Sequence, residues 1–247
     1  RLHPPLYLNG TEIKEVKEHK HLGIWLSSDL SWSYHINYIH TIASRRLDIL
    51  KALKMKIDRK SLKVLYFSNV QSILEYGDVI WDFPRENDHT CDIIDKLQVK
   101  AARIVTRATE RSSRAKRFEE LEWEKLSSRR ANHRLIFFYK IINEMAPQYL
   151  IDLLPKQVSE RTNYNLRNRN DLDNPLARLN ALYYSFYQWT SRQWNMLSEE
   201  TKNLPHLSQF KNALKNKRKC NPIFYYGERT TSVFHTRLRL GCSKLND

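Results

Sequence analysis

The chain has 247 residues and a formal charge of +15, because 42 Lys and Arg residues outnumber 27 Asp and Glu residues. Aromatic residues make up 11% of the sequence, which excludes a basic disordered tail, since the chain has side chains from which to build a core. No apolar run is long enough for a membrane helix or a signal peptide, so we expect no membrane partner. By itself the positive excess favours a polyanionic partner, with nucleic acid first and an anionic membrane surface second, and a basic protein without such a partner is the alternative.

Glycine and cysteine usage indicate a helix-rich protein of a reducing compartment. Five glycines in the whole chain fit a structure with few tight turns. The cysteines, Cys91, Cys220 and Cys242, are odd in number and lack C-x-x-C spacing, which argues against a disulfide framework or a zinc site. We therefore expect a protein of the nucleus and cytoplasm. The first residue, Arg1, suggests a fragment or a processed piece.

Two β segments are predicted before the helices begin. Asn9-Gly10 tolerates the positive φ angles of a two-residue turn and predicts a hairpin between Leu6–Leu8 and Thr11–Ile13. A charged link then leads to a strand over residues 21–26, whose apolar residues alternate onto one face. Gly23 in this strand either lets another backbone approach closely or forms a bulge.

Apolar residues recur at helical spacing from residue 33 onward. The candidate N-caps of the first helix are Asp29, Ser31 and Ser33, the second helix is capped by Asp58, and Gly77 is expected to end it. The predicted helices lie over residues 33–53, 58–76, 87–108, 118–121, 123–145 and 182–194 and around residue 210.

Proline and polar residues interrupt this pattern at two places. The segment 78–84 is predicted to be a loop, because its period is broken and it ends in Pro84. Residues 147–182 contain three prolines in a polar context and predict an irregular connector. The fold is therefore predicted to be mostly α: a short N-terminal β-hairpin and strand, then a helical bundle, then a helical C-terminal region.

Basic residues concentrate in two places. Lys96, Lys100, Arg103 and Arg107 have i, i+4, i+7, i+11 spacing, so they share one face of the predicted helix, opposite its apolar face. Such a row can follow a phosphate backbone, and a solvated face that merely keeps the protein soluble is the alternative. A second basic cluster at the junction of the first two helices favours nucleic acid. The further candidate phosphate ligands are Lys51, Lys54, Lys56, Arg59, Lys60, Arg114 and Arg117.

No constellation of residues predicts catalysis. A two-metal centre needs clustered carboxylates, but Asp171 and Asp173 are more typical of a turn, and Glu119-Glu120-Leu121-Glu122 of the N-terminal turn of a helix. His19 and His21 have no further ligand at a suitable spacing, so ordinary histidines are expected. The sequence has no nucleophile elbow and no phosphate-binding loop. We expect no catalytic residue, metal site or cofactor in this chain.

Several blocks of sequence together resemble the C-terminal part of the reverse transcriptases of non-LTR (LINE-type, jockey-like) retrotransposons. The block over residues 20–26, with Leu30-Ser31-Trp32 and His35-Ile36, is similar to the run that follows their catalytic palm. The block over residues 73–82, Ile-Leu-Glu-Tyr-Gly-Asp-Val-Ile-Trp-Asp, resembles their thumb signature. The remaining similar blocks are Leu97–Arg103, Trp194-Asn195, Leu204-Pro205, Phe210-Lys211 and His235–Gly241.

The resemblance implies a division of labour. A preceding palm and fingers would carry the catalytic aspartates and their Mg²⁺, while this chain would hold the RNA template and the RNA–DNA or DNA primer duplex. Residues 1–30 would then be the end of the palm, 31–146 a helical thumb, 147–182 a connector and 183–247 a basic, truncated C-terminal region. In this family the last palm hairpin grips the primer end. The primer-grip-like residues would be His21, Leu22, Gly23 and Ile24.

Within the resemblance, Tyr76 and Trp81 are expected to be packing anchors rather than base-stacking groups. Alone, the chain is expected to polymerise nothing. The competing hypothesis is a stand-alone helical interaction module whose basic faces bind acidic protein surfaces. An independent nuclease ranks last, because no carboxylate cluster supports it.

Overall fold

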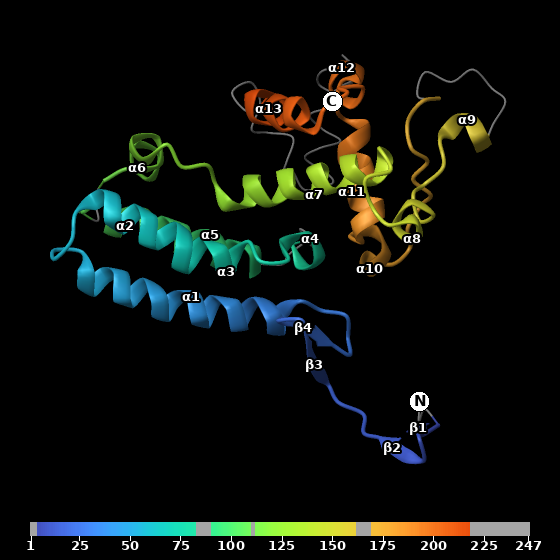
Figure 1. The fold of residues 1–247 in the computed structure, drawn as a ribbon, viewed down its shortest axis with the longest axis horizontal. Helices are drawn as coiled ribbons and strands as arrows, with labels where there is room; N and C mark the ends of the chain where they lie inside the picture. Colours follow the sequence, from blue (N-terminus) through green and yellow to red (C-terminus); the bar gives the residue numbers. More distant parts are fainter. Residues whose placement is uncertain (1–3, 83–89, 110–111, 162–168, 218–247) are drawn as a thin grey trace, which may run out of the picture.

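The computed structural model describes residues 4–82, 90–109, 112–161 and 169–217 (Figure 1). The predicted fold class is confirmed: helices dominate, and two short antiparallel strand pairs precede them. In these ranges no helix is both long and apolar enough to cross a membrane. The predictions for Cys220, Cys242 and the blocks after residue 217 fall outside the described residues. The strands are β1 Leu6–Leu8, β2 Thr11–Ile13, β3 Glu18–His21 and β4 Ile24–Ser27.

In the first half of the chain the helices agree with the predicted segments except at α4, which falls on a predicted loop, and at α6, which begins earlier than expected; in the second half they are shorter and more numerous than predicted. Those of the first half are α1 Ser33–Leu53, α2 Arg59–Tyr66, the π-helical turn η1 Phe67–Gln71, α3 Ser72–Leu74, α4 Asp78–Trp81, α5 Thr90–Thr106 and α6 Arg114–Leu121. Those that follow are α7 Leu126–Ile142, α8 Gln148–Ile151, α9 Val158–Arg161, α10 Asn180–Tyr183, α11 Phe186–Asn195, α12 Glu199–Lys202 and α13 Leu207–Lys217.

The first hydrophobic core lies between α1, the run α2–η1–α3 and α5, which are side by side in Figure 1. Burying one aliphatic side chain contributes about 1.5–3 kcal/mol, so the apolar stripes of α1 and α5 decide which faces meet. The apolar residues at helical spacing that are buried on these two helices are Ile36, Ile39, Ala43, Leu47, Leu50, Ile94, Leu97, Ala101 and Val105.

The helix caps are only partly as predicted. The N-cap residue of α1 is Trp32, whose side chain makes no capping hydrogen bond, and the carboxylate of Asp29 accepts a hydrogen bond from the backbone of Ser31 (2.9 Å) in the preceding turn. Asp58 caps α2 as expected, accepting from the backbone N–H groups of Lys60 (2.9 Å) and Ser61 (3.1 Å). Hydrogen bonds, first that of the Ser61 hydroxyl, hold the pKa of Asp58 below its usual value.

The loop predicted after Gly77 is wrong for its first four residues, which form α4. Gly77 has the left-handed φ of +60° expected at a helix end, but the chain then makes one further helical turn. Trp81 is 1% exposed and its Nε1 donates to the carbonyl of Tyr76 (2.9 Å), while Asp78 is also buried. These buried contacts hold a turn that is too short to show a helical period.

A long helix, α7, joins the first core to a second one. Leu126, its first residue, belongs to the first core, whereas Leu135, Phe138 and Tyr139 pack with α11 and α13 in the second. Tyr139 stacks on Phe210 of α13 with 4.5 Å between ring centroids. α7 therefore contributes residues to both cores.

The predicted connector carries some order of its own. In its described part, α8 and α9 are single helical turns, and Gln157 and Leu172 form an isolated antiparallel bridge. The hydroxyl of Tyr187 on α11 donates to the carbonyl of Leu150 on α8 (2.8 Å), which ties the connector to the second core. Residues 162–168 lie outside the described ranges.

Candidate nucleic-acid interface

The primer-grip-like segment is a turn, not one continuous strand. His21 ends β3 and pairs with Ile24, which begins β4, while Leu22 (φ +46°) and Gly23 (φ +87°) form the two-residue connection. Positive φ at both central residues gives the turn whose twist matches that of the paired strands. The strand predicted over residues 21–26 is therefore correct for residues 24–26 but wrong at Leu22 and Gly23, because alternation of apolar residues does not show where a chain reverses.

This turn, residues 22–23, is held against the segment 73–82. The hydroxyl of Tyr76 donates to the carbonyl of Leu22 (2.8 Å), and a Cβ built on Gly23 would lie 3.2 Å from the Tyr76 ring. A Cβ on Gly77 would lie 2.7 Å from Cδ1 of Ile24. Of the two interpretations of Gly23, the close approach is confirmed. The group that approaches is the side chain of Tyr76 rather than another backbone, and Gly23 lies in a turn rather than in a strand.

Acidic residues of the segment 73–82 pair with basic residues of α7, and we call this arrangement the ionic clamp. Glu75 accepts two hydrogen bonds from Arg129, and Asp78 Oδ2 lies 2.5 Å from Nδ1 of His133. The third acid is Asp82, which contacts two arginines. These clamp residues on α7 follow i, i+4 spacing, as one helix face requires. The clamp consists of Glu75, Asp78, Asp82, Arg129, Arg130, His133 and Arg134.

Asp82 is the buried centre of the ionic clamp. Its carboxylate accepts from Nε of Arg130 (2.7 Å) and from Nη1 of Arg134, and Arg130 also contacts Asp95 at 3.3 Å. Burial raises the pKa of Asp82, but the two guanidinium groups outweigh burial and hold its pKa below the usual range. Part of the basic excess after residue 96 is therefore internal and does not face a partner.

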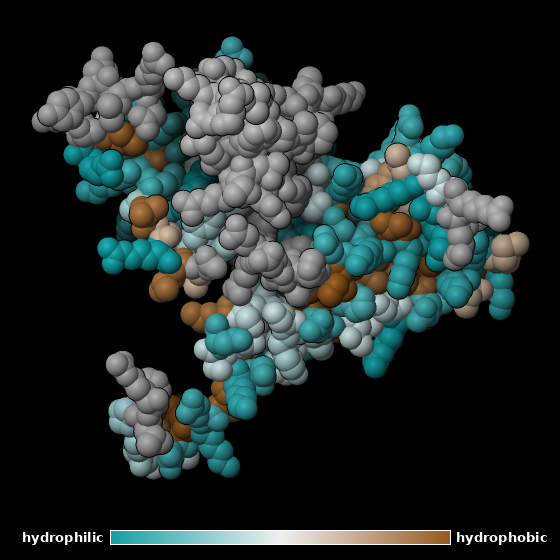
Figure 2. All heavy atoms as spheres, turned by 180° about the vertical axis from the view of Figure 1, so that it is seen from behind, coloured by the Kyte–Doolittle hydropathy of each residue, from teal (hydrophilic) through white to brown (hydrophobic). Residues whose placement is uncertain are grey.

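Exposed basic residues gather at the end of the bundle where α1 passes into α2. Lys51, Lys56 and Lys60 are exposed and Lys54 is half-buried, which agrees with a surface cluster. Arg59 lies beside α6, where its Nη1 is 2.5 Å from Oε1 of Glu120. In Figure 2, seen from behind, hydrophilic residues predominate at this end of the molecule, with hydrophobic residues between them. We call it the basic end.

The row on α5 runs toward the basic end. Lys96 and Lys100 are exposed and Arg103 is half-buried on α5 itself. Arg107 lies one residue beyond the helix, with φ +55°, and its Nη2 donates to the carbonyl of Ile57 between α1 and α2 (2.7 Å). This hydrogen bond brings the two predicted basic clusters together, which sequence spacing alone did not require.

The two candidates on α6 have different environments. Arg114 is exposed, with its guanidinium 5.5 Å from the centre of the Phe118 ring. Arg117 is only 7% exposed, and its Nη1 donates to the hydroxyl of Ser112 (3.3 Å). A phosphate backbone outside the protein has little access to a buried guanidinium, so we leave Arg117 out of the basic end.

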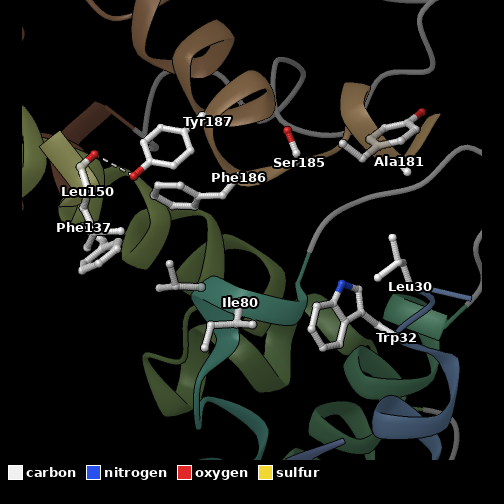
Figure 3. Close-up of a pocket in the computed structure, with 11 residues that line it drawn as sticks. Leu30, Trp32, Ile80, Phe137, Leu150, Ala181, Ser185, Phe186 and Tyr187 are labelled. Carbon is white, nitrogen blue, oxygen red and sulfur yellow. Dashed lines mark hydrogen bonds between the residues drawn. The ribbon is translucent and has the colours of Figure 1, made fainter. Parts of the chain in front are cut away.

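A separate apolar cavity of about 420 Å³ lies between α4 and α11 (Figure 3). Trp32, Phe137 and Phe186 line it, and the hydroxyl of Tyr187 at its wall is already bonded to a carbonyl. Among the described residues, none of those that line this cavity is charged. The lining therefore offers phosphate no cation, and the cavity is distinct from the basic end.

The acidic groups considered for catalysis have structural contacts. Asp171 pairs with Lys202 (3.2 Å) and Asp173 with Arg161 (3.3 Å). The acidic run at 119–122 ends α6, so its prediction as a helix N-terminus is wrong. Among the residues that the structure describes, no three His, Cys, Asp or Glu side chains are placed to hold a metal ion.

Comparison of the chain with protein-family models, with curated proteins and with solved structures found no match. Any function proposed for the chain therefore depends on its residues and their placement.

Proposed function

We propose that this chain is the nucleic-acid-binding thumb and C-terminal part of a retrotransposon RNA-directed DNA polymerase, and that it holds the template–primer duplex. The observation that carries the proposal is the basic end. There Lys51, Lys56 and Lys60 face solvent, and the hydrogen bond from Arg107 to Ile57 joins this cluster to the row on α5. Clustered, solvated cations on a rigid helical scaffold suit the backbone of a duplex, since phosphate contacts position a nucleic acid without reading its sequence.

The ionic clamp supports the same proposal, because it shows which basic residues stabilise the fold and which remain available to bind a phosphate. Arg130 and Arg134 are at most 1% exposed and already contact Asp82, so they are part of the scaffold. At the basic end, Lys51, Lys56 and Lys60 are instead exposed to solvent. In the alternative function, a stand-alone interaction module, the same lysines would bind an acidic protein surface.

The test is the binding of the whole chain to a blunt RNA–DNA hybrid, measured by fluorescence anisotropy over a range of salt concentrations. A triple variant, Lys51→Ala, Lys56→Ala and Lys60→Ala, is expected to bind more weakly. The slope of the logarithm of its binding constant against the logarithm of the salt concentration is expected to become shallower by about 0.9 for each phosphate that the removed lysines had neutralised. Binding of the wild type that does not change with salt would contradict the proposal.

The matched control is Lys14→Ala, Lys17→Ala and Lys211→Ala, which removes three exposed lysines elsewhere and changes net charge equally. Equal losses in the two triple variants would show that net charge, and not the basic end, attracts the duplex. A second comparison reverses charge on the α5 row, at Lys100 and Arg103. Intact hybrid binding in a folded Lys100→Glu, Arg103→Glu variant would favour the protein-interaction module.

A further inference from the structure

An aromatic cluster lies where β4 meets the beginning of α1. Trp25 of β4 meets Tyr34 and Tyr38 of α1 edge to face, with centroids 5.0 Å and 5.9 Å apart. An edge-to-face contact covers the face of only one ring of each pair. Tyr34 is accordingly 44% exposed, and Trp25 and Tyr38 are each partly exposed. Aromatic surface is therefore accessible at this end of α1.

A lysine from β3 completes the cluster. Nζ of Lys20 donates to the hydroxyl of Tyr38 (2.8 Å) and lies 4.7 Å from the centre of that ring. The side chain is exposed, so its ammonium group is held at the edge of the aromatic surface while it remains in contact with water. A cation beside an aromatic face suits the two parts of a nucleotide, a base that can stack and a phosphate that can pair.

We propose that this cluster, the aromatic platform (Lys20, Trp25, Tyr34 and Tyr38), binds an unpaired nucleotide of a strand whose duplex part occupies the basic end. The proposal rests on the proposed function and adds a second contact site to it. Stacking tolerates any base, because every base has a π face, so the platform would select unpaired nucleotides rather than a sequence.

The exposed face of α1 connects the two sites. Tyr34, Tyr38 and Arg45 follow i, i+4, i+11 spacing on the side opposite the buried stripe, and Arg45 is exposed. Lys51 lies about 26 Å from Tyr34 along the helix, at 1.5 Å per residue. A strand stacked at about 3.4 Å per nucleotide, as in B-form DNA, would need roughly eight nucleotides to span this distance, which sets the length of the unpaired extension in the experiment.

The experiment compares a blunt RNA–DNA hybrid with the same hybrid carrying an unpaired extension of about eight nucleotides on one strand. The whole chain is expected to bind the extended hybrid more tightly. Tyr34→Ala is expected to weaken binding of the extended hybrid roughly 5- to 150-fold, the usual loss for one stacked base, and to leave blunt binding unchanged. Tyr34→Phe retains the ring and is expected to bind like wild type.

The control is Tyr149→Ala, which removes a tyrosine that is 67% exposed on α8, away from the aromatic platform. A 2-aminopurine in the extension, quenched when stacked, tests the unaltered chain as well. No quenching and equal binding of the two hybrids would overturn the platform while leaving the basic end intact. Quenching of a single strand that depends on Tyr34, without binding of the blunt hybrid, would instead contradict the proposed function alone.

Discussion

Removing the carboxylate at the centre of the ionic clamp is expected to destabilise the fold more than removing any exposed acid. Asp82 is 4% exposed and contacts both Arg130 and Arg134, which are 0% and 1% exposed. Deleting one partner of a buried ion pair costs about 3–5 kcal/mol, whereas an exposed pair contributes about 0–1 kcal/mol. Asp82→Ala is therefore expected to lower the free energy of unfolding by about 3–5 kcal/mol.

The assay is thermal and urea unfolding followed by circular dichroism. For a chain of this size, about 2–4 °C per kcal/mol predicts a Tm lower by roughly 6–20 °C. Asp48→Ala is the control, because it removes an exposed carboxylate from α1 and changes the net charge equally. A loss for Asp82→Ala no larger than that of Asp48→Ala would refute the view that the clamp stabilises the joint between α4 and α7.

The pH dependence of the same variant gives a second check. Because the pKa of Asp82 is held below its usual value of about 3.9, its contribution is complete above that pH and is lost as the pH falls through the lower pKa of the folded state. The stability difference between wild type and Asp82→Ala should therefore narrow below about pH 4. A difference that stays constant into strong acid would contradict the assigned cause.

Three further outcomes follow from single contacts, each measured by urea unfolding. Gly77→Ala should lower the free energy of unfolding by about 1–2 kcal/mol from its left-handed φ alone. The loss caused by Gly77→Ala should be smaller in an Ile24→Ala background, because that variant lacks the Cδ1 that the new Cβ meets. If the effects of the two substitutions simply add, the contact is contradicted. Burial, with help from the charge of Lys20, lowers the pKa of His35 to about 4, so stability should fall as the pH drops from 6.5 to 4, and His35→Phe should abolish this slope; an unchanged slope would exclude His35 as its source. Gln98→Leu should cost about 1–3 kcal/mol, because the buried amide accepts from the backbone of Leu126 (2.9 Å) at the start of α7; a neutral result would mean that another group satisfies that N–H.

A rigid joint at the clamp matters for the proposed function. Tyr76 and Gly77 support the turn of β3–β4, and three acids of the same segment hold α7. If the chain binds a duplex at the basic end, the segment 73–82 fixes the position of the aromatic platform relative to that duplex. Clamp variants that remain folded are therefore expected to weaken binding of the extended hybrid more than that of the blunt hybrid.

Local pattern was sufficient for much of the fold. The stripes of α1 and α5, the Asp58 cap and the Asn9-Gly10 hairpin follow from helical period, capping chemistry and turn geometry, which operate within a few neighbouring residues. Of the two expected packing anchors, Trp81 is 1% exposed and lies in the core, whereas Tyr76 is 56% exposed, so its expected place among the core aromatics is wrong. Lys51, Lys56 and Lys60 lie on the surface, as charged side chains in a polar stretch should.

Only the tertiary structure decided which charges face a partner. In the sequence, Arg129, Arg130 and Arg134 cannot be distinguished from Lys96 or Lys100, since all belong to one basic stretch. Arg130 and Arg134 have i, i+4 spacing, but so do Lys96 and Lys100, and only the packing of α4 against α7 brings the first pair to Asp82. Whether a charged side chain stabilises the fold or can bind a partner depends on whether residues distant in the sequence bury it and pair with it. The sequence alone does not show which distant residues lie close together in space.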